Sequence, residues 1–139
     1  MKHESTYRVP YADTDQMKVV YYANYFIYFE RSRTDMLRDL GLSYREMEER
    51  GFILPVAEAH CKYKSPAHYD DLLTFRSWVA EMRGVRVTIR TDVLRGETLL
   101  VSGSVTLACV NAERKLVRLP DFFTDACRKV FEPEEGGAK

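Results

Sequence analysis

The sequence predicts an α+β fold in which a curved antiparallel sheet wraps around one long central helix. Two observations lead to this class. One helical pattern, from about Asn24 to Leu40, is much longer than any other in the chain. The segments after it change to the two-residue period of strands and are joined by tight turns. Because helices and strands are segregated along the chain, the class is α+β, and the long helix is the only large cover for the sheet.

The long helix follows a turn that carries two carboxylates. We expect a loop over Tyr11–Lys18, in which Asp13 and Asp15 are typical turn residues. Asn24 is expected to cap the helix, whose apolar residues recur at steps of three and four. Gly41 is expected to end the helix at its C′ position.

The remaining elements are shorter. A second helix is expected over Ser43–Arg50, because Ser43 and Glu46 have the spacing of a capping box. Alternation of apolar and polar residues in the first strand after it predicts one buried face. The expected strands are Ser5–Val9, Val56–Tyr63, Leu72–Met82, Val85–Leu94, Thr98–Val110 and a short Leu116–Leu119, and a terminal helix is expected from Pro120 to about Val130.

Length and composition indicate one globular domain. The 139 residues are 45% hydrophobic and 30% charged, which is ordinary for a chain that buries one core. We expect this domain over residues 1–131 and a polar, disordered tail over residues 132–139. The three cysteines are odd in number and widely spaced, which favours reduced thiols in a cytoplasmic protein.

Charge and hydropathy argue against two classes of partner. The 21 Lys and Arg residues balance 21 Asp and Glu residues, whereas non-specific nucleic-acid binding needs a basic surplus. No apolar run approaches the ~20 residues that span a bilayer, and no secretory signal is visible, so membrane insertion is not expected. The three histidines lack the spacing of a zinc motif, so no metal site is expected.

Three segments of the chain match the motifs of a known family. They are DTDQMKVVYYANYFIYFERSRTDMLRDLG, YKSPAHYDDLLTF and KLVRLPD. Together they resemble the hotdog-fold acyl-CoA thioesterases of the 4-hydroxybenzoyl-CoA thioesterase and YbgC-like family, over about Tyr7 to Phe122. The resemblance implies a hotdog fold and hydrolysis of acyl-CoA thioesters without a metal or organic cofactor. It also implies a homodimer whose two sheets join edge to edge, commonly assembled into a homotetramer.

Thioester hydrolysis makes the start of the long helix the candidate catalytic site. Unpaired backbone N–H groups near Tyr22 and Ala23 would stabilise negative charge on the carbonyl oxygen. A carboxylate must activate water or attack the carbonyl, and the resemblance points to Asp15 without deciding between these roles. Two departures from the family are Tyr22, where many members have His, and Gln16–Lys18, where small residues are usual.

Candidate residues for binding the rest of the substrate lie on other segments. The resemblance places the coenzyme A nucleotide near the hairpin of Arg83 and Arg86, and arginine suits phosphate contacts. A solvated turn explains these arginines equally well. His68 is a candidate pocket residue or a surface residue of a polar loop, and Asn24 is a candidate contact as well as a cap.

Two other functions stay open. The first is a hotdog protein that binds acyl-CoA or acyl-carrier protein without turnover, or that serves mainly as an interaction partner. The second is a dehydratase. The dehydratase branch of the hotdog proteins normally relies on a His near the helix start. No His stands there in this chain.

Overall fold

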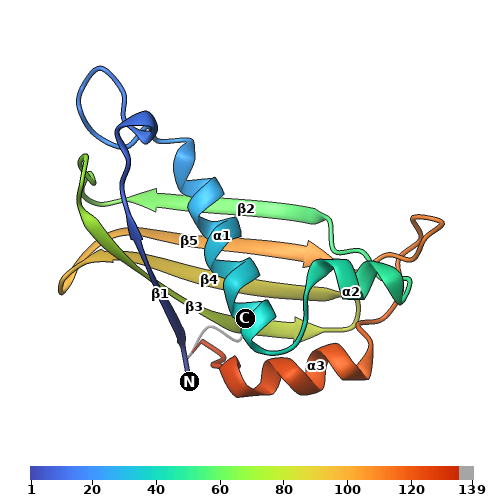
Figure 1. Ribbon diagram of the computed structural model, residues 1–139. Coiled ribbons are helices and arrows are strands. Elements are labelled where there is room, and N and C mark those ends of the chain that lie inside the picture. The colour runs from blue at the N-terminus through green and yellow to red at the C-terminus, as the bar shows by residue number, and fades with distance from the viewer. Residues whose placement is uncertain (135–139) are drawn as a thin grey trace.

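A computed structural model describes residues 1–134 as one five-stranded antiparallel sheet with helix α1 against one face (Figure 1). The antiparallel sheet and the α+β class predicted from the sequence are confirmed. The end of the predicted tail, residues 135–139, lies outside the described residues. The strands are β1 His3–Arg8, β2 Val56–Tyr63, β3 Leu72–Arg83, β4 Arg86–Arg95 and β5 Thr98–Ala108; the helices are α1 Asn24–Asp39, α2 Tyr44–Glu49 and α3 Asp121–Cys127, with 3-10 turns η1 Tyr11–Asp13 and η2 Arg128–Val130.

The sheet has the strand order β1-β3-β4-β5-β2, so β1 and β2 form its two edges. Tight hairpins join β3 to β4 and β4 to β5, as the sequence predicted. The prediction of one buried face for β2 is wrong: only Cys61 is even half-buried along this strand. Because β2 lies at the edge beyond the cover of α1, its alternating residues have no layer of this chain to pack against.

Helix α1 packs on the sheet through large side chains spread along its length. Tyr28, Phe29, Met36 and Leu37 are at most 1% exposed. The ring of Phe29 lies against the backbone of Gly103 on β5, and a Cβ at that position would overlap the ring. The absent side chain of Gly103 therefore sets how closely α1 approaches the sheet.

The start of α1 differs from the prediction. Ala23 is the N-cap, it makes no side-chain capping bond, and Asn24 is the first helical residue. The Asn24 side-chain amide instead donates to the Asp13 carbonyl at 2.9 Å. The prediction of Asn24 as the cap is wrong because the helix already includes Asn24, and the Nδ2 bond to the Asp13 carbonyl holds its side chain against the preceding turn. The end of α1 is as predicted, with Gly41 at a φ of 83°.

Two predicted elements near the C-terminus are also different. Leu116–Leu119 is not a strand, because its N–H groups at Val117 and Leu119 bond to different loops, at the carbonyls of Cys109 and Gly84. The terminal helix is divided into α3 and η2. The predicted cap of α2 is confirmed, since Ser43 Oγ accepts the Glu46 N–H at 3.0 Å.

The described part of the predicted tail contacts the sheet. The Glu132 N–H donates to the Val79 carbonyl at 2.9 Å, and the Glu134 carboxylate lies 2.8 Å from the Arg90 guanidinium. Cys61, Cys109 and Cys127 are free thiols. Within residues 1–134, each helix is too short or too polar to cross a membrane.

The Asp13 carboxylate connects β1, the following turn and α1. Its Oδ2 accepts hydrogen bonds from the hydroxyls of Tyr7, at 2.7 Å, and Tyr28, at 2.8 Å. Burial and this neighbouring carboxylate raise the pKa of Tyr7 to about 12, and they raise the pKa of Tyr28 as well. Both hydroxyls therefore stay protonated and hold the turn against the helix.

We expect Gly103→Ala to destabilise the protein by about 1–3 kcal/mol, because the added methyl group forces the Phe29 ring or the α1 backbone to move. Urea unfolding measures the loss. Ser104→Ala, at the next position of β5 and on the other face, is the matched control and should leave stability nearly unchanged. Equal stability of the Gly103→Ala variant and the wild type would contradict this packing.

We expect the free energy of unfolding to fall as pH rises above about 10. The ordinary tyrosine pKa is about 10. In the native protein the pKa of Tyr7 is raised to about 12, and the pKa of Tyr28 is raised as well. The stabilisation linked to these groups is complete below about pH 10. It is lost as pH rises towards 12, because the unfolded chain releases protons that the native chain keeps.

Urea titrations between about pH 9 and pH 11 measure this slope. Tyr28→Phe should flatten it, whereas Tyr69→Phe, at an exposed tyrosine, should leave it unchanged. Parallel slopes for the wild type and Tyr28→Phe would contradict the assignment.

Candidate active site

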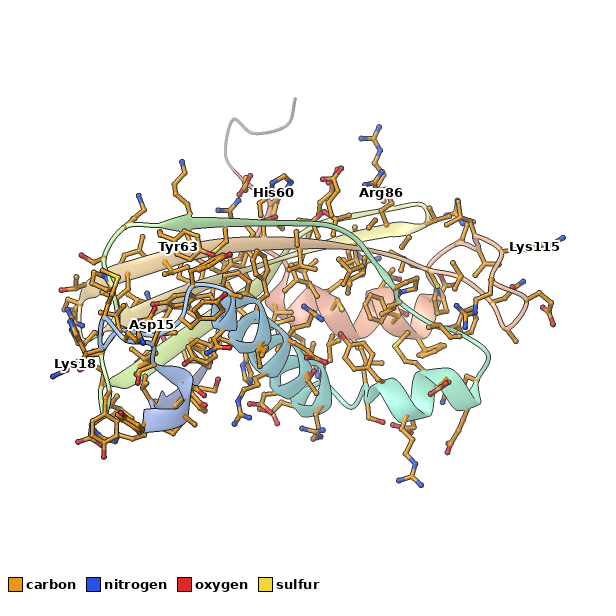
Figure 2. The ribbon with its side chains drawn as sticks, turned by 90° about the horizontal axis from the view of Figure 1, so that it is seen from above. Asp15, Lys18, His60, Tyr63, Arg86 and Lys115 are labelled. Carbon is orange, nitrogen blue, oxygen red and sulfur yellow. The ribbon has the colours of Figure 1, made fainter. Side chains whose placement is uncertain are left out.

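Asp15 lies on a tight turn near the start of α1 (Figure 2). Its N–H donates to the Val19 carbonyl at 2.9 Å, and its carbonyl accepts the Lys18 N–H at 2.8 Å. Carboxylate Oδ1 accepts the Met17 N–H at 2.8 Å. Lys18 has a φ of 66°, in the left-handed region that disfavours residues other than glycine. The turn thus holds one oxygen of the half-buried Asp15 carboxylate, and the other oxygen has no partner among residues 1–134.

Backbone hydrogen bonds fold this turn back onto the helix start. Thr14 pairs with Val20 in an antiparallel bridge, so the chain returns after Asp15 alongside its own incoming segment. The Asp13 carbonyl accepts both the Tyr21 N–H and the Asn24 side-chain amide, each at 2.9 Å. The carboxylate-bearing turn and the first turn of α1 are therefore one connected unit.

A cavity of about 340 Å³ opens beside the first turn of α1. Three tyrosines dominate its wall, with the Tyr63 ring centroid 6.4 Å from that of Tyr22 and 5.6 Å from that of Tyr25. Of the site residues predicted from the sequence, only Tyr22 lines this cavity. The full lining is Val20, Tyr22, Tyr25, Tyr63, Lys64, Ser65 and Pro66.

Two N–H groups at this helix start have no acceptor within residues 1–134, those of Tyr22 and Ala23. The N–H groups on either side are bonded: that of Tyr21 to the Asp13 carbonyl at 2.9 Å, and that of Asn24 to the Tyr21 carbonyl at 2.8 Å. Free donors at the positive end of a helix dipole attract negative charge. The side chain of Tyr22 is 61% exposed, so a ligand has access to this region.

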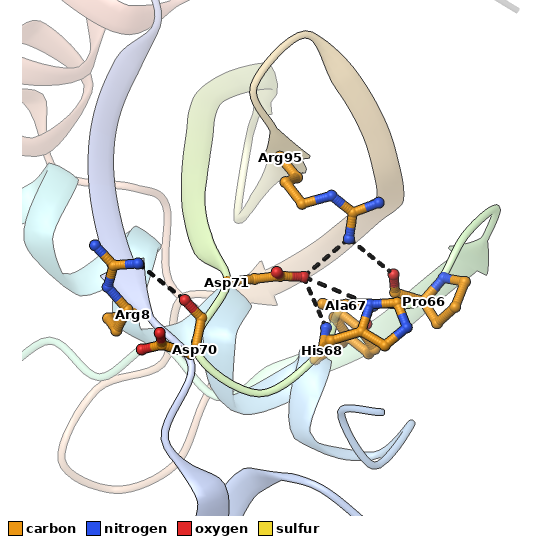
Figure 3. Close-up of polar contacts among 8 residues, drawn as sticks. Arg8, Pro66, Ala67, His68, Asp70, Asp71 and Arg95 are labelled. Carbon is orange, nitrogen blue, oxygen red and sulfur yellow. Dashed lines mark hydrogen bonds and ion pairs between the residues drawn. The ribbon is translucent and has the colours of Figure 1, made fainter. Parts of the chain in front are cut away.

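His68 lies on a loop that a carboxylate and an arginine hold in place (Figure 3). Asp71 Oδ2 accepts the His68 N–H at 2.8 Å and lies 2.9 Å from Arg95 Nη1. Burial acts to raise the pKa of Asp71, but the His68 N–H and the Arg95 guanidinium outweigh it and lower that pKa. The His68 backbone pairs with Val19, beside the Asp15 turn. Its imidazole is half exposed and lies 3.7 Å from Asp71 Oδ2.

Within one chain, the structure does not bring Arg83 and Arg86 to the Asp15 turn. The two arginines face each other across the β3–β4 hairpin. The Asp15 turn follows β1, whose end pairs with the start of β3. The 12 residues of β3 make 11 steps of ~3.3 Å, so the strand separates the two regions by about 36 Å along its length. Figure 2 shows Asp15 near one end of the molecule and Arg86 past its middle.

Sequence reasoning missed three residues that shape this region: Tyr63, Asp71 and Arg95. The Tyr63 hydroxyl donates to the Tyr22 carbonyl at 3.0 Å, across 41 residues of sequence. Arg95 reaches the loop of His68 from the β4–β5 hairpin. Only the spacing of Asp71, three residues after His68, gives a local signal, because such a carboxylate commonly accepts a nearby N–H.

Comparisons with known proteins place this architecture in a family. Residues 9–127 match the Thioesterase-like superfamily. The chain is 35% identical to the Bacillus subtilis protein YneP over 107 residues, which cover 76% of this chain and 77% of that protein. It is 34% identical to the acyl-CoA thioester hydrolase YbgC of Escherichia coli over 105 residues, which cover 75% of this chain and 78% of that protein.

A solved structure agrees with this relationship. The DHNA-CoA thioesterase from Staphylococcus aureus superposes with a TM-score of 0.84 at 31% sequence identity, covering 93% of this chain and 90% of that one. The family predicted from the sequence motifs is therefore confirmed: this chain belongs to the Thioesterase-like superfamily.

Proposed function

We propose that this protein hydrolyses acyl-CoA thioesters, with Asp15 as general base or nucleophile and the N–H groups of Tyr22 and Ala23 as the oxyanion site. The observation that carries the proposal is the pair of free donors at the start of α1, beside a cavity lined by tyrosines. Family membership supports the reaction class. The name of the Escherichia coli relative supports coenzyme A as the carrier of the acyl group.

The proposed reaction uses the two parts of the site for different tasks. The N–H groups donate to the thioester oxygen as it gains negative charge. As a base, Asp15 takes a proton from water, whose oxygen attacks the carbonyl carbon while the C–S bond breaks. As a nucleophile, Asp15 attacks that carbon itself, the C–S bond breaks to release the thiolate, and water then hydrolyses the resulting anhydride, regenerating the Asp15 carboxylate. Both routes release the free acid and the coenzyme A thiol.

The proposal includes the hotdog arrangement, in which the sheet wraps around α1 as a central helix. Helix α1 has 16 residues, more than any other helix within residues 1–134. Its buried face, with Tyr28, Phe29, Met36 and Leu37, packs on one side of the sheet. This arrangement would leave the first turn of α1 at the end of the sheet, where a substrate can reach it.

A second copy of the chain is part of the proposed active unit. The free edge of β2 can pair with another strand, and the strand is exposed along nearly its whole length. Apolar side chains beside that edge are exposed as well: Phe26 by 38%, Ile27 by 53% and Val56 by 55%. A homodimer joined through β2 would cover them. A homotetramer stays a prediction.

Antiparallel pairing of β2 with its own copy would bring the arginines to the proposed site. It would place the Val56 end of one β2 beside the Tyr63 end of the other. Arg86 belongs to the Val56 end, where its guanidinium lies 3.8 Å from the Glu58 carboxylate. Arg86 is on β4, so only β5 and β2 of its own copy would separate it from β2 of the other copy, which lines the cavity. Because neighbouring strands are ~4.8 Å apart, Arg86 would approach that cavity. Arg83 and Arg86 would then bind the nucleotide phosphates of a substrate held by the second copy.

We expect Asp15→Asn to lower kcat at least about 100-fold with a folded protein, because the amide can still accept the Met17 N–H but can neither take a proton nor attack readily. Release of free thiol from short, long and aromatic acyl-CoAs is the measurement. Asp125→Asn, at an exposed carboxylate of α3, is the matched control and should keep full activity.

The same assay separates the enzyme from the alternative functions. If the wild type binds acyl-CoA and releases no thiol from any member of the panel, the protein is an acyl-CoA binder and hydrolysis is ruled out. If Asp15→Asn retains the wild-type rate, the carboxylate that acts belongs to another residue.

We expect Arg83→Ala and Arg86→Ala each to raise KM for acyl-CoA about tenfold, because each removes a charged partner of a phosphate. Neither change should affect hydrolysis of the same acyl group on pantetheine, which lacks the nucleotide. Arg45→Ala, at an exposed arginine of α2, is the control. An equal loss for both substrates would show that these arginines act on folding or chemistry and do not bind the nucleotide.

A further inference from the structure

A tyrosine from β2 holds the peptide group that follows Tyr22. The Tyr63 hydroxyl donates to the Tyr22 carbonyl oxygen at 3.0 Å. The second donor to the same oxygen is the Tyr25 N–H, at a longer distance of 3.4 Å. Burial raises the pKa of Tyr63, as does the neighbouring Cys61 thiol, so the hydroxyl keeps the proton that it donates. Of the two hydrogen bonds to this carbonyl, the one from the Tyr63 hydroxyl is the shorter.

The carbonyl that Tyr63 holds and the N–H of Ala23 belong to one peptide unit. A trans peptide is planar, so its C=O and N–H point in opposite directions and rotate together. Fixing the Tyr22 carbonyl therefore fixes the direction of the Ala23 N–H. A hydrogen bond accepted by a peptide carbonyl also polarises the N–H of the same unit and makes it a stronger donor.

The second proposed donor is fixed in another way. The Tyr22 N–H belongs to the peptide unit whose carbonyl is that of Tyr21, and this carbonyl accepts the Asn24 N–H at 2.8 Å. Backbone bonding within the helix start thus holds one donor. The other donor depends on a side chain from β2, the strand at the free edge of the sheet.

We propose that Tyr63 is a positioning residue for catalysis, which orients and polarises the Tyr22–Ala23 peptide so that the Ala23 N–H binds the thioester oxygen. The inference rests on the proposed hydrolase function and adds to it the side chain that prepares one oxyanion donor. Tyr63 also links catalysis to β2, because the edge strand that would pair in a dimer carries this hydroxyl.

The first test is Tyr63→Phe, which removes the hydroxyl and keeps the ring contacts with Tyr22 and Tyr25. We expect kcat to fall about tenfold while KM stays within about twofold, because the lost interaction strengthens only as charge develops. Tyr11→Phe, at a tyrosine that is 77% exposed, is the matched control and should retain full kcat. An unchanged kcat in an active Tyr63→Phe enzyme overturns the inference and leaves the proposed function standing.

A spectroscopic measurement separates positioning from simple anchoring of β2. The carbonyl of a carbon-13-labelled acyl-CoA, bound to the Asp15→Asn protein, should absorb at lower infrared frequency than in water because the two N–H groups polarise it. Adding Tyr63→Phe should reverse part of that shift. A lowered Tm with an unchanged carbonyl frequency would mean that the hydroxyl only anchors β2, and would overturn the inference.

A double-mutant cycle tests whether Tyr63 acts through Ala23. Ala23→Pro removes the N–H in question, and the native φ of −72° suits proline. In the Ala23→Pro protein, Tyr63→Phe should cause no further fall in kcat. Multiplicative losses from the two substitutions would mean that Tyr63 acts by another route. Absence of thiol release from the wild type would instead refute the proposed function itself.

Discussion

The architecture of the candidate site depends on the Asp13 carboxylate. Two tyrosine hydroxyls, from β1 and from the N-terminal half of α1, donate to one of its oxygens, and the Asp13 carbonyl binds two groups at the helix start. These contacts join an edge strand, a turn and a helix within a few residues. Asp15 lies two residues further along this fixed turn. The position of its carboxylate relative to α1 is therefore set by the hydrogen bonds of Asp13 together with those that Asp15 makes within the turn.

Local patterns predicted the elements whose stability is local. The long helix, its glycine stop, the capped second helix and the two hairpins depend on residues close together in the sequence. The predicted helix cap was wrong because the helix begins one residue earlier than expected: Asn24 is its first residue, and its Nδ2 group donates to the Asp13 carbonyl of the preceding turn. The predicted strand at Leu116–Leu119 failed similarly, because its N–H groups find partners on two separate loops.

The candidate site was only partly predictable from the sequence, because most of its contacts are tertiary. The family motifs gave Asp15, Tyr22 and Ala23 with the turn that carries them. No local pattern gave Tyr63, which lies 41 residues from the carbonyl that it binds, or Arg95, which comes from a hairpin. The predicted burial of one face of β2 was also wrong. Alternation of apolar and polar residues shows that a face is suited to burial, but it does not show that another element of the same chain packs against that face.

Unpaired N–H groups are usual at a helix start, and at the exposed Tyr22 and Ala23 they are open to water or to a ligand. In this structure the surrounding groups are bonded: Tyr21 and Asn24 donate, and the carbonyls of Tyr21 and Tyr22 accept. Both donors lie before the first helical residue, where a capping side chain does not bind, because an N-cap side chain accepts from the N–H groups two or three residues further on. Those N–H groups, of Tyr25 and Phe26, donate to the carbonyls of Tyr22 and Ala23. On the proposed mechanism, the N–H groups of Tyr22 and Ala23 therefore stay open to the thioester oxygen.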